Sequence, residues 1–79
     1  MRKTAEEKRQ ALVKEIALRK RALDAMRRVA DFVLRQGEGE DNPYFMGFLT
    51  TLAVQRGMQE IAIVNRKQRL EASYEAKNR

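Results

Sequence analysis

The stretch Gly37-Glu38-Gly39-Glu40-Asp41-Asn42-Pro43 is the only marked interruption in a chain of 79 residues. It holds two of the four glycines and the only proline, and long helix-favouring segments flank it on both sides. Gly37 suits the left-handed residue that follows a helix, and Asn42 with Pro43 suits the N-cap and first turn of the next helix. The sequence therefore predicts an all-α fold in which two long antiparallel helices form a helical hairpin.

The limits of the two helices follow from capping signals and apolar periodicity. Thr4, with Glu7 three residues later, fits a capping box at the start of the first helix. After Asn65 the chain is mostly charged or polar, so we expect its C-terminal end to fray. The predicted organisation is a single helical-hairpin domain, 1–79, comprising a helix over 4–36, a turn over 37–42, a helix over 43–72 and a frayed tail over 73–79.

The first helix carries apolar residues on a wide face. One stripe, interrupted only by Arg19, repeats every three or four residues: Leu12, Ile16, Leu23, Met26, Ala30 and Val33. A second stripe runs beside it: Leu18, Ala22, Ala25, Val29 and Phe32. Two paired helices need only a narrow seam, so this width predicts contact with more than one neighbouring helix.

The second helix is apolar on nearly every side over residues 44–54 and then narrows to one stripe. That stripe comprises Val54, Met58, Ile61, Asn65, Gln68 and Ala72. If the hairpin closes near residue 40, facing positions have numbers that add to about 80. This register places Gly47 opposite Val33 and Gly57 opposite Leu23, where small residues permit close helix packing.

A lone pair of helices cannot enclose a core, so we expect a homo-oligomer, with two coiled-coil hairpins in a four-helix bundle as the simplest form. Large apolar side chains near the turn exceed what one facing helix covers. We predict an oligomer interface formed by Val29, Phe32, Phe45, Phe48, Leu49 and Leu52.

Two polar residues within the stripes are candidates for setting the register between helices or subunits. Arg19 pairs with Glu15 or with a carboxylate of a partner, or alternatively extends its charged end past its neighbours into solvent. Asn65 resembles a buried register-setting polar residue, or alternatively is a solvated residue near a fraying end.

The chain is basic, with a net charge of +6, and eleven Lys or Arg residues against five Asp or Glu lie before the turn. A basic face on the first helix is a candidate for binding nucleic acid or a phosphorylated ligand: Lys20, Arg21, Arg27, Arg28 and Arg35. The alternative is an ordinary solvated face. Lys20 and Arg28 lie four positions from Asp24, Arg27 and Arg35 lie four positions from Asp31, and no aromatic side chain is interleaved to stack on a base.

The chain contains few of the residue types that catalytic and metal sites use. The chain has no cysteine and no histidine, which excludes disulfides, zinc sites of thiolate or imidazole, and nucleophiles paired with histidine. Glu38, Glu40 and Asp41 match no EF-hand and are typical of a solvated turn. We therefore expect no enzyme activity, no cofactor and no metal.

Membrane insertion is not expected. The apolar stretch over 43–64 contains Arg56 and Glu60, whose charges are costly in the middle of a bilayer, and its uncharged part over 42–55 is too short to span one. The first residues have no apolar segment of a secretory signal. These features favour a cytoplasmic protein.

The sequence thus predicts a non-catalytic helical binding or adaptor module that acts by protein–protein interaction as a homo-oligomer. Its partners would be further copies of itself and another protein. Nucleic acid or a phosphorylated ligand on the basic face is the alternative, and a structural assembly subunit is the second alternative. No residue motif identifies a family.

Overall fold

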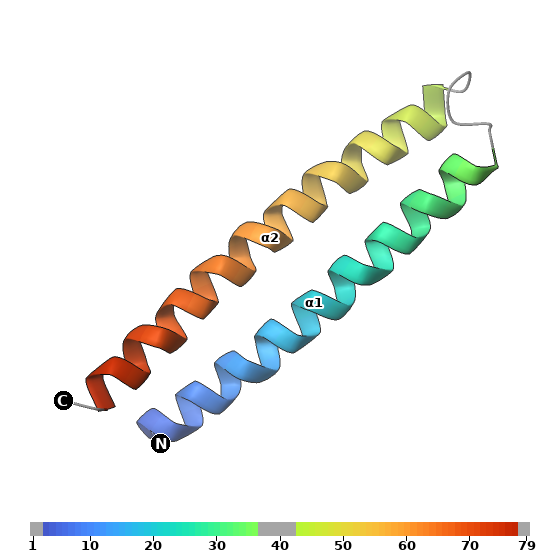
Figure 1. The fold of residues 1–79 in the computed structure, drawn as a ribbon. Coiled ribbons are helices and arrows are strands. Elements are labelled where there is room, and N and C mark those ends of the chain that lie inside the picture. The colour runs from blue at the N-terminus through green and yellow to red at the C-terminus, as the bar shows by residue number, and fades with distance from the viewer. Residues whose placement is uncertain (1–2, 37–42, 78–79) are drawn as a thin grey trace.

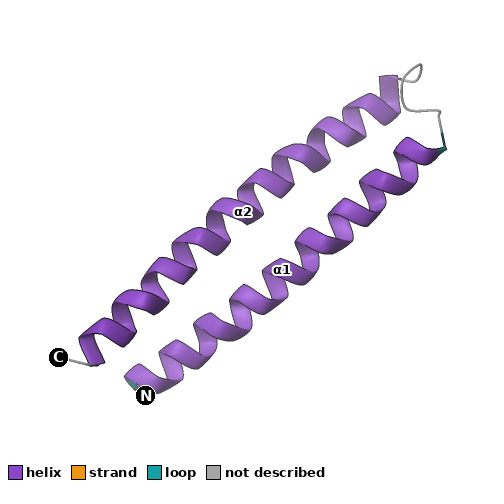
Figure 2. Ribbon diagram, viewed as in Figure 1, coloured by secondary structure: helices purple, strands orange, loops and turns teal. Residues whose placement is uncertain are grey.

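The computed structural model describes residues 3–36 and 43–77, which form two α-helices and no strand. Helix α1 spans Ala5–Arg35 and helix α2 spans Pro43–Lys77. The helices lie side by side and run antiparallel, so that the two chain ends meet at one end of a rod (Figures 1 and 2). The rod measures 57 × 21 × 18 Å. The predicted all-α fold is confirmed.

The N-terminal cap of α1 forms as the sequence predicts. The Thr4 hydroxyl oxygen accepts a hydrogen bond from the Glu7 backbone N–H at 3.2 Å and donates one to the Glu7 carboxylate at 3.3 Å. Helix α1 ends at a C-cap formed by Gln36, whose backbone N–H donates to the Phe32 carbonyl at 3.2 Å. The predicted limits of the first helix are correct to within one residue. The predicted cap residues Gly37 and Asn42 lie outside the described residues.

Helix α2 is longer than predicted, because it continues to Lys77 instead of fraying after residue 72. The extra residues include neither glycine nor proline. Ser73 and Tyr74 also contact α1, since both lie against the guanidinium group of Arg9. A tertiary contact of this kind stabilises a helix end that propensity alone would leave frayed.

The contact between α1 and α2 follows the spacing of a coiled-coil seam, with covered residues three and four positions apart. In α1 the seam residues are Arg9, Leu12, Ile16, Arg19, Leu23, Met26, Ala30 and Val33. In α2 they are Phe45, Leu49, Leu52, Arg56, Gln59, Ile63, Arg66, Leu70 and Ser73.

The core that this seam encloses is thin. Its buried apolar side chains are Ile16, Leu23, Ala30 and Ile63, with Leu70 packed against them, and no described side chain is fully buried. A folded monomer of 9.2 kDa is expected to expose about 4,900 Å², whereas this chain exposes 6548 Å². Much of the apolar surface therefore has no cover within one chain.

Two expectations about the packing of α2 were wrong. The stripe that begins at Val54 and includes Met58 and Ile61 faces away from α1 and is exposed. A Cβ atom added at Gly47 or Gly57 would meet no atom within 4 Å, so neither glycine permits a close approach in the hairpin. Because α2 carries two stripes with the same spacing, the sequence alone did not show which stripe contacts α1.

Substitution of two isoleucines tests which face of α2 contacts α1. Ile63 is 7% exposed in the seam, and Ile61 is 64% exposed on the outer side. We expect Ile63→Ala to lower the free energy of unfolding by about 2–5 kcal/mol, because it leaves a cavity, whereas Ile61→Ala changes it by about 0.5 kcal/mol or less. Urea unfolding followed by circular dichroism at equal protein concentration measures both. Equal losses would contradict the observed packing.

Candidate functional site

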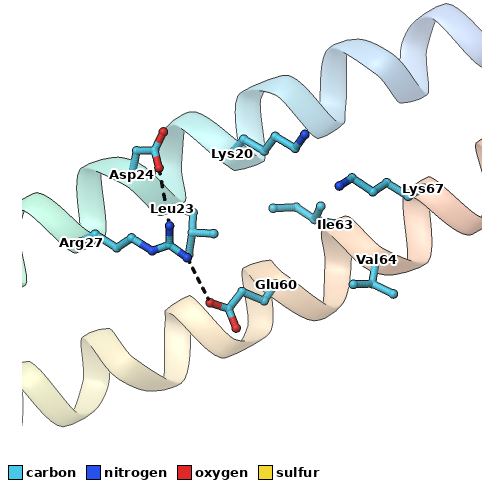
Figure 3. Close-up of a pocket in the computed structure, with 8 residues that line it drawn as sticks. All are labelled: Lys20, Leu23, Asp24, Arg27, Glu60, Ile63, Val64 and Lys67. Carbon is cyan, nitrogen blue, oxygen red and sulfur yellow. Dashed lines mark ion pairs between the residues drawn. The ribbon is translucent and has the colours of Figure 1, made fainter.

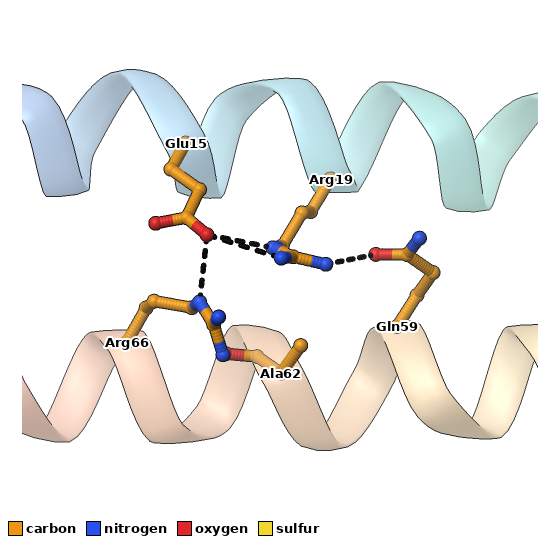
Figure 4. Close-up of polar contacts among 5 residues, drawn as sticks. All are labelled: Glu15, Arg19, Gln59, Ala62 and Arg66. Carbon is orange, nitrogen blue, oxygen red and sulfur yellow. Dashed lines mark hydrogen bonds and ion pairs between the residues drawn. The ribbon is translucent and has the colours of Figure 1, made fainter.

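A polar layer crosses the middle of the seam (Figure 4). One carboxylate oxygen of Glu15 accepts hydrogen bonds from Arg66 Nε at 2.8 Å and from Arg19 Nη2 at 3.0 Å. Arg19 Nη1 donates to the side-chain oxygen of Gln59 at 2.9 Å. A single carboxylate thus joins guanidinium groups of both helices, and this geometry exists in only one register of the hairpin.

The charge of Glu15 is stabilised in this layer. Hydrogen bonds from Arg66 and, next, from Arg19 lower the pKa of the Glu15 carboxyl below its ordinary value of 4.5. Arg19 therefore occupies the seam and pairs with Glu15, one of the two arrangements that the sequence left open. Its predicted role in setting the register has a structural basis within the hairpin.

A second polar layer closes the end of the seam near the chain termini. Arg9 is only 6% exposed and pairs with Glu6 at 2.7 Å, which lowers the pKa of the Glu6 carboxyl. It also donates a hydrogen bond to Ser73 Oγ at 3.2 Å, and its Cζ atom lies 5.6 Å from the centre of the Tyr74 ring. The burial of Arg9 was missed from the sequence, although Arg9 lies three residues before Leu12 and so continues the spacing of the seam.

A further polar residue of the seam, Arg56, lies between its apolar layers. Its Nε atom is buried without a hydrogen-bond partner in the part of the chain that the structure describes, as is Arg9 Nε. Unpaired buried N–H groups cost free energy. The polar residues of the seam therefore contribute more to the register of the two helices than to the stability of the hairpin.

An open groove of about 380 Å³ runs along one side of the seam (Figure 3). Leu23 and Ile63 contribute to its apolar lining, while Lys20 and Lys67 project along it from α1 and α2. Arg27, which also lines the groove, lies 4.0 Å from Asp24 and 3.7 Å from Glu60. This side of the hairpin, named the charged flank, consists of the residues that directly follow each seam residue.

The opposite side differs sharply in chemistry. Helix periodicity places there the residues that directly precede each seam residue. Between positions 18 and 65 none of these residues is charged. This uncharged flank comprises Leu18, Ala22, Ala25, Val29 and Phe32 of α1 and Phe48, Thr51, Gln55, Met58, Ala62 and Asn65 of α2.

The structure separates the predicted interface residues into two groups. Val29, Phe32 and Phe48 are exposed on the uncharged flank, where a partner can reach them. The other three, Phe45, Leu49 and Leu52, are half-buried seam residues that face α1. Asn65 is exposed and contributes nothing to the seam, so its predicted role in register applies only to contacts with another chain.

The predicted basic residues are spread over two faces. Lys20 and Arg27 lie on the charged flank, whereas Arg21, Arg28 and Arg35 lie on the outer face of α1, away from the seam. The ion pairs expected four residues apart are absent among the described residues, where Arg27 pairs with Asp24 and Glu60 instead. Exposed pairs of this kind are weak, which explains why the predicted set does not form.

Comparison with known protein families, curated proteins and solved structures found no match. Within residues 3–36 and 43–77 there is also no cluster of three or more acidic, histidine or cysteine side chains that could hold a metal ion. Neither described helix contains a stretch apolar enough to cross a membrane. Function must therefore be inferred from the surfaces of the hairpin.

The network around Glu15 predicts a specific acid sensitivity. Because the folded-state pKa of Glu15 is lowered, its stabilisation is complete above its ordinary pKa of 4.5 and is lost as the pH falls through the lowered value. We expect Glu15→Gln to lower the melting temperature at pH 7 and to flatten its decline from pH 7 to about pH 3. The control is Glu75→Gln, at an exposed position that has no ion pair with the described residues. An acid profile of Glu15→Gln as steep as that of the wild type would refute this role.

Proposed function

We propose that this protein is a non-catalytic helical binding module that acts by protein–protein interaction and assembles with itself. The observation that carries the proposal is the uncharged flank, where Val29, Phe32 and Phe48 remain exposed although each is large and apolar. Self-assembly of two hairpins into a four-helix bundle would cover this flank.

The free energies of association can be compared in order of magnitude. Burying one fully exposed large apolar side chain contributes roughly 1.5–3 kcal/mol, and Val29, Phe32 and Phe48 are already about half covered, so three from each of two copies contribute roughly 4–9 kcal/mol. Association costs about 4–15 kcal/mol in lost motion, before the further contacts of the flank are counted. The gain from these three side chains is therefore comparable to the cost, and the other contacts of the flank would supply the surplus that makes assembly favourable.

The distribution of charge also favours the uncharged flank as the surface of self-assembly. A chain with a net charge of +6 repels its copies. Stacking through the uncharged flank would place the charged flanks on the two outer sides of the bundle, where water and salt screen them. The outer side of α2, with Val54 and Ile61 exposed, would remain available to another protein.

Two neighbouring positions on α1 provide a matched test. Phe32 is 64% exposed on the uncharged flank, and Leu34 is 59% exposed on the charged flank. We expect Phe32→Asp to reduce the mass of the assembly in light scattering, because it places a charge in the buried interface. Leu34→Asp should keep the mass of the wild type. Loss of assembly in both variants, or in neither, would argue against the uncharged flank as the interface.

A second candidate function is the binding of a phosphate-bearing polyanion to the charged flank. Its support is that Lys20 and Lys67 line the same groove and neither forms an ion pair with any residue that the structure describes. Arg27 is a weaker candidate than the sequence suggested, since Asp24 and Glu60 already neutralise its charge. Unpaired cations on both walls of a groove suit a ligand that neutralises them.

Removing both lysines tests this second function. We expect Lys20→Gln with Lys67→Gln to weaken binding to a panel of duplex DNA, single strands and structured RNA. The slope of log affinity against log salt should flatten by roughly 0.7–0.9 for each lost contact. Lys3→Gln with Lys8→Gln removes equal charge elsewhere and should change both quantities less. Absence of binding by the wild type at about 50 mM salt would exclude this function.

A further inference from the structure

We infer that the uncharged flank is occupied by a second copy of this chain, stacked antiparallel about a two-fold axis that passes beside Ala25. The inference rests on the proposed function, because it specifies how the homo-oligomer forms. It assigns one partner, one orientation and one register to a surface that the hairpin leaves open.

The sequence of the flank is self-complementary in this orientation. In an antiparallel pair of α1 helices centred on Ala25, facing residues have numbers that add to about 50. Ala25 then faces the partner's Ala25, Ala22 faces the partner's Val29, and Leu18 faces the partner's Phe32. The layers run from large through small to large, so that the helices approach most closely at the central alanines.

The packing of the hairpin determines where the same axis crosses α2. Hydrogen bonds join Glu15 to Arg66 and Arg19 to Gln59, so level residues of α1 and α2 have numbers that add to about 80, and Ala25 lies level with about Gln55. An antiparallel pair of α2 helices centred on Gln55 brings Phe48 level with the partner's Ala62 and Thr51 level with the partner's Met58. Helix α2 therefore also pairs a large side chain with a small one about this axis.

A second copy also accounts for the surface that one chain leaves exposed. The chain exposes roughly 1,600 Å² more than a folded monomer of its mass. This excess is within the range that each partner buries in an obligate homodimer. A strongly charged partner would bring charges against an uncharged surface and leave its own charges unpaired.

The absence of cysteine from the chain permits a direct test by single substitutions. Under mild oxidation we expect Ala25→Cys to form a disulfide-linked dimer, because residues at the two-fold axis lie within disulfide reach. Ala22→Cys should not, because its two copies would lie about 10 Å apart along the helix axis. Ala17→Cys, on the charged flank, is the matched control. The expected difference is on the order of tenfold in linked dimer.

The combination of Ala22→Cys with Val29→Cys should restore the cross-link, since these residues face each other across the axis. Equal cross-linking of Ala22→Cys and Ala25→Cys would overturn the inference, because antiparallel stacking brings only the two copies of residue 25 together. Gln55→Cys repeats the test on α2 if Ala25→Cys disturbs folding, which circular dichroism would reveal. Light scattering of the reduced proteins separates the two proposals. A dimer that fails to cross-link at both positions overturns the arrangement alone, whereas a folded monomer overturns both proposals.

Discussion

Two helices can cover only one side of each other, and the organisation of this protein follows from that constraint. Helices α1 and α2 bury four apolar side chains between them and leave the large side chains of Val29, Phe32 and Phe48 on the surface. The hairpin is therefore a rod with a defined seam and an uncharged flank whose large apolar side chains are not covered. Assembly is the simplest physical answer, because it adds the second layer of helices that a core requires.

The seam favours a unique register over maximal stability. Glu15 joins Arg19 and Arg66 across it, and Arg9 closes its open end, but Arg56 has a buried Nε atom without a partner among the described residues. Replacing such layers with apolar residues often stabilises a protein, whereas their hydrogen bonds form in only one alignment. A hairpin built in this way determines which residues reach the uncharged flank, and the assembly that we propose would add burial to its thin core.

The sequence predicted the elements well and their faces less well. Local rules at Thr4, Glu7 and Pro43 predict both limits of α1 and the start of α2, and the structure agrees with these three limits to within one residue. The seam of α2 could not be assigned, because stripes containing Ile61 and Ile63 repeat with the same spacing and differ only in their tertiary contacts. Arg66 and Gln59 were missed for the same reason.

The continuation of α2 past residue 72 depends on Arg9, whose long-range contact with Tyr74 leaves no local signal. The uncharged flank combines Val29 and Phe32, which the sequence singled out, with residues of α2 that only the packed hairpin brings beside them.

The dependence of the wild-type melting temperature on protein concentration tests the central claim most directly. If the hairpin needs a second copy to complete its core, folding and association are linked, and mass action raises the melting temperature as the concentration rises. We predict a clear increase over a hundredfold range of about 1–100 μM, measured by circular dichroism at constant salt and pH. A cooperative melt at a temperature independent of concentration, with the mass of a monomer throughout, would contradict the account.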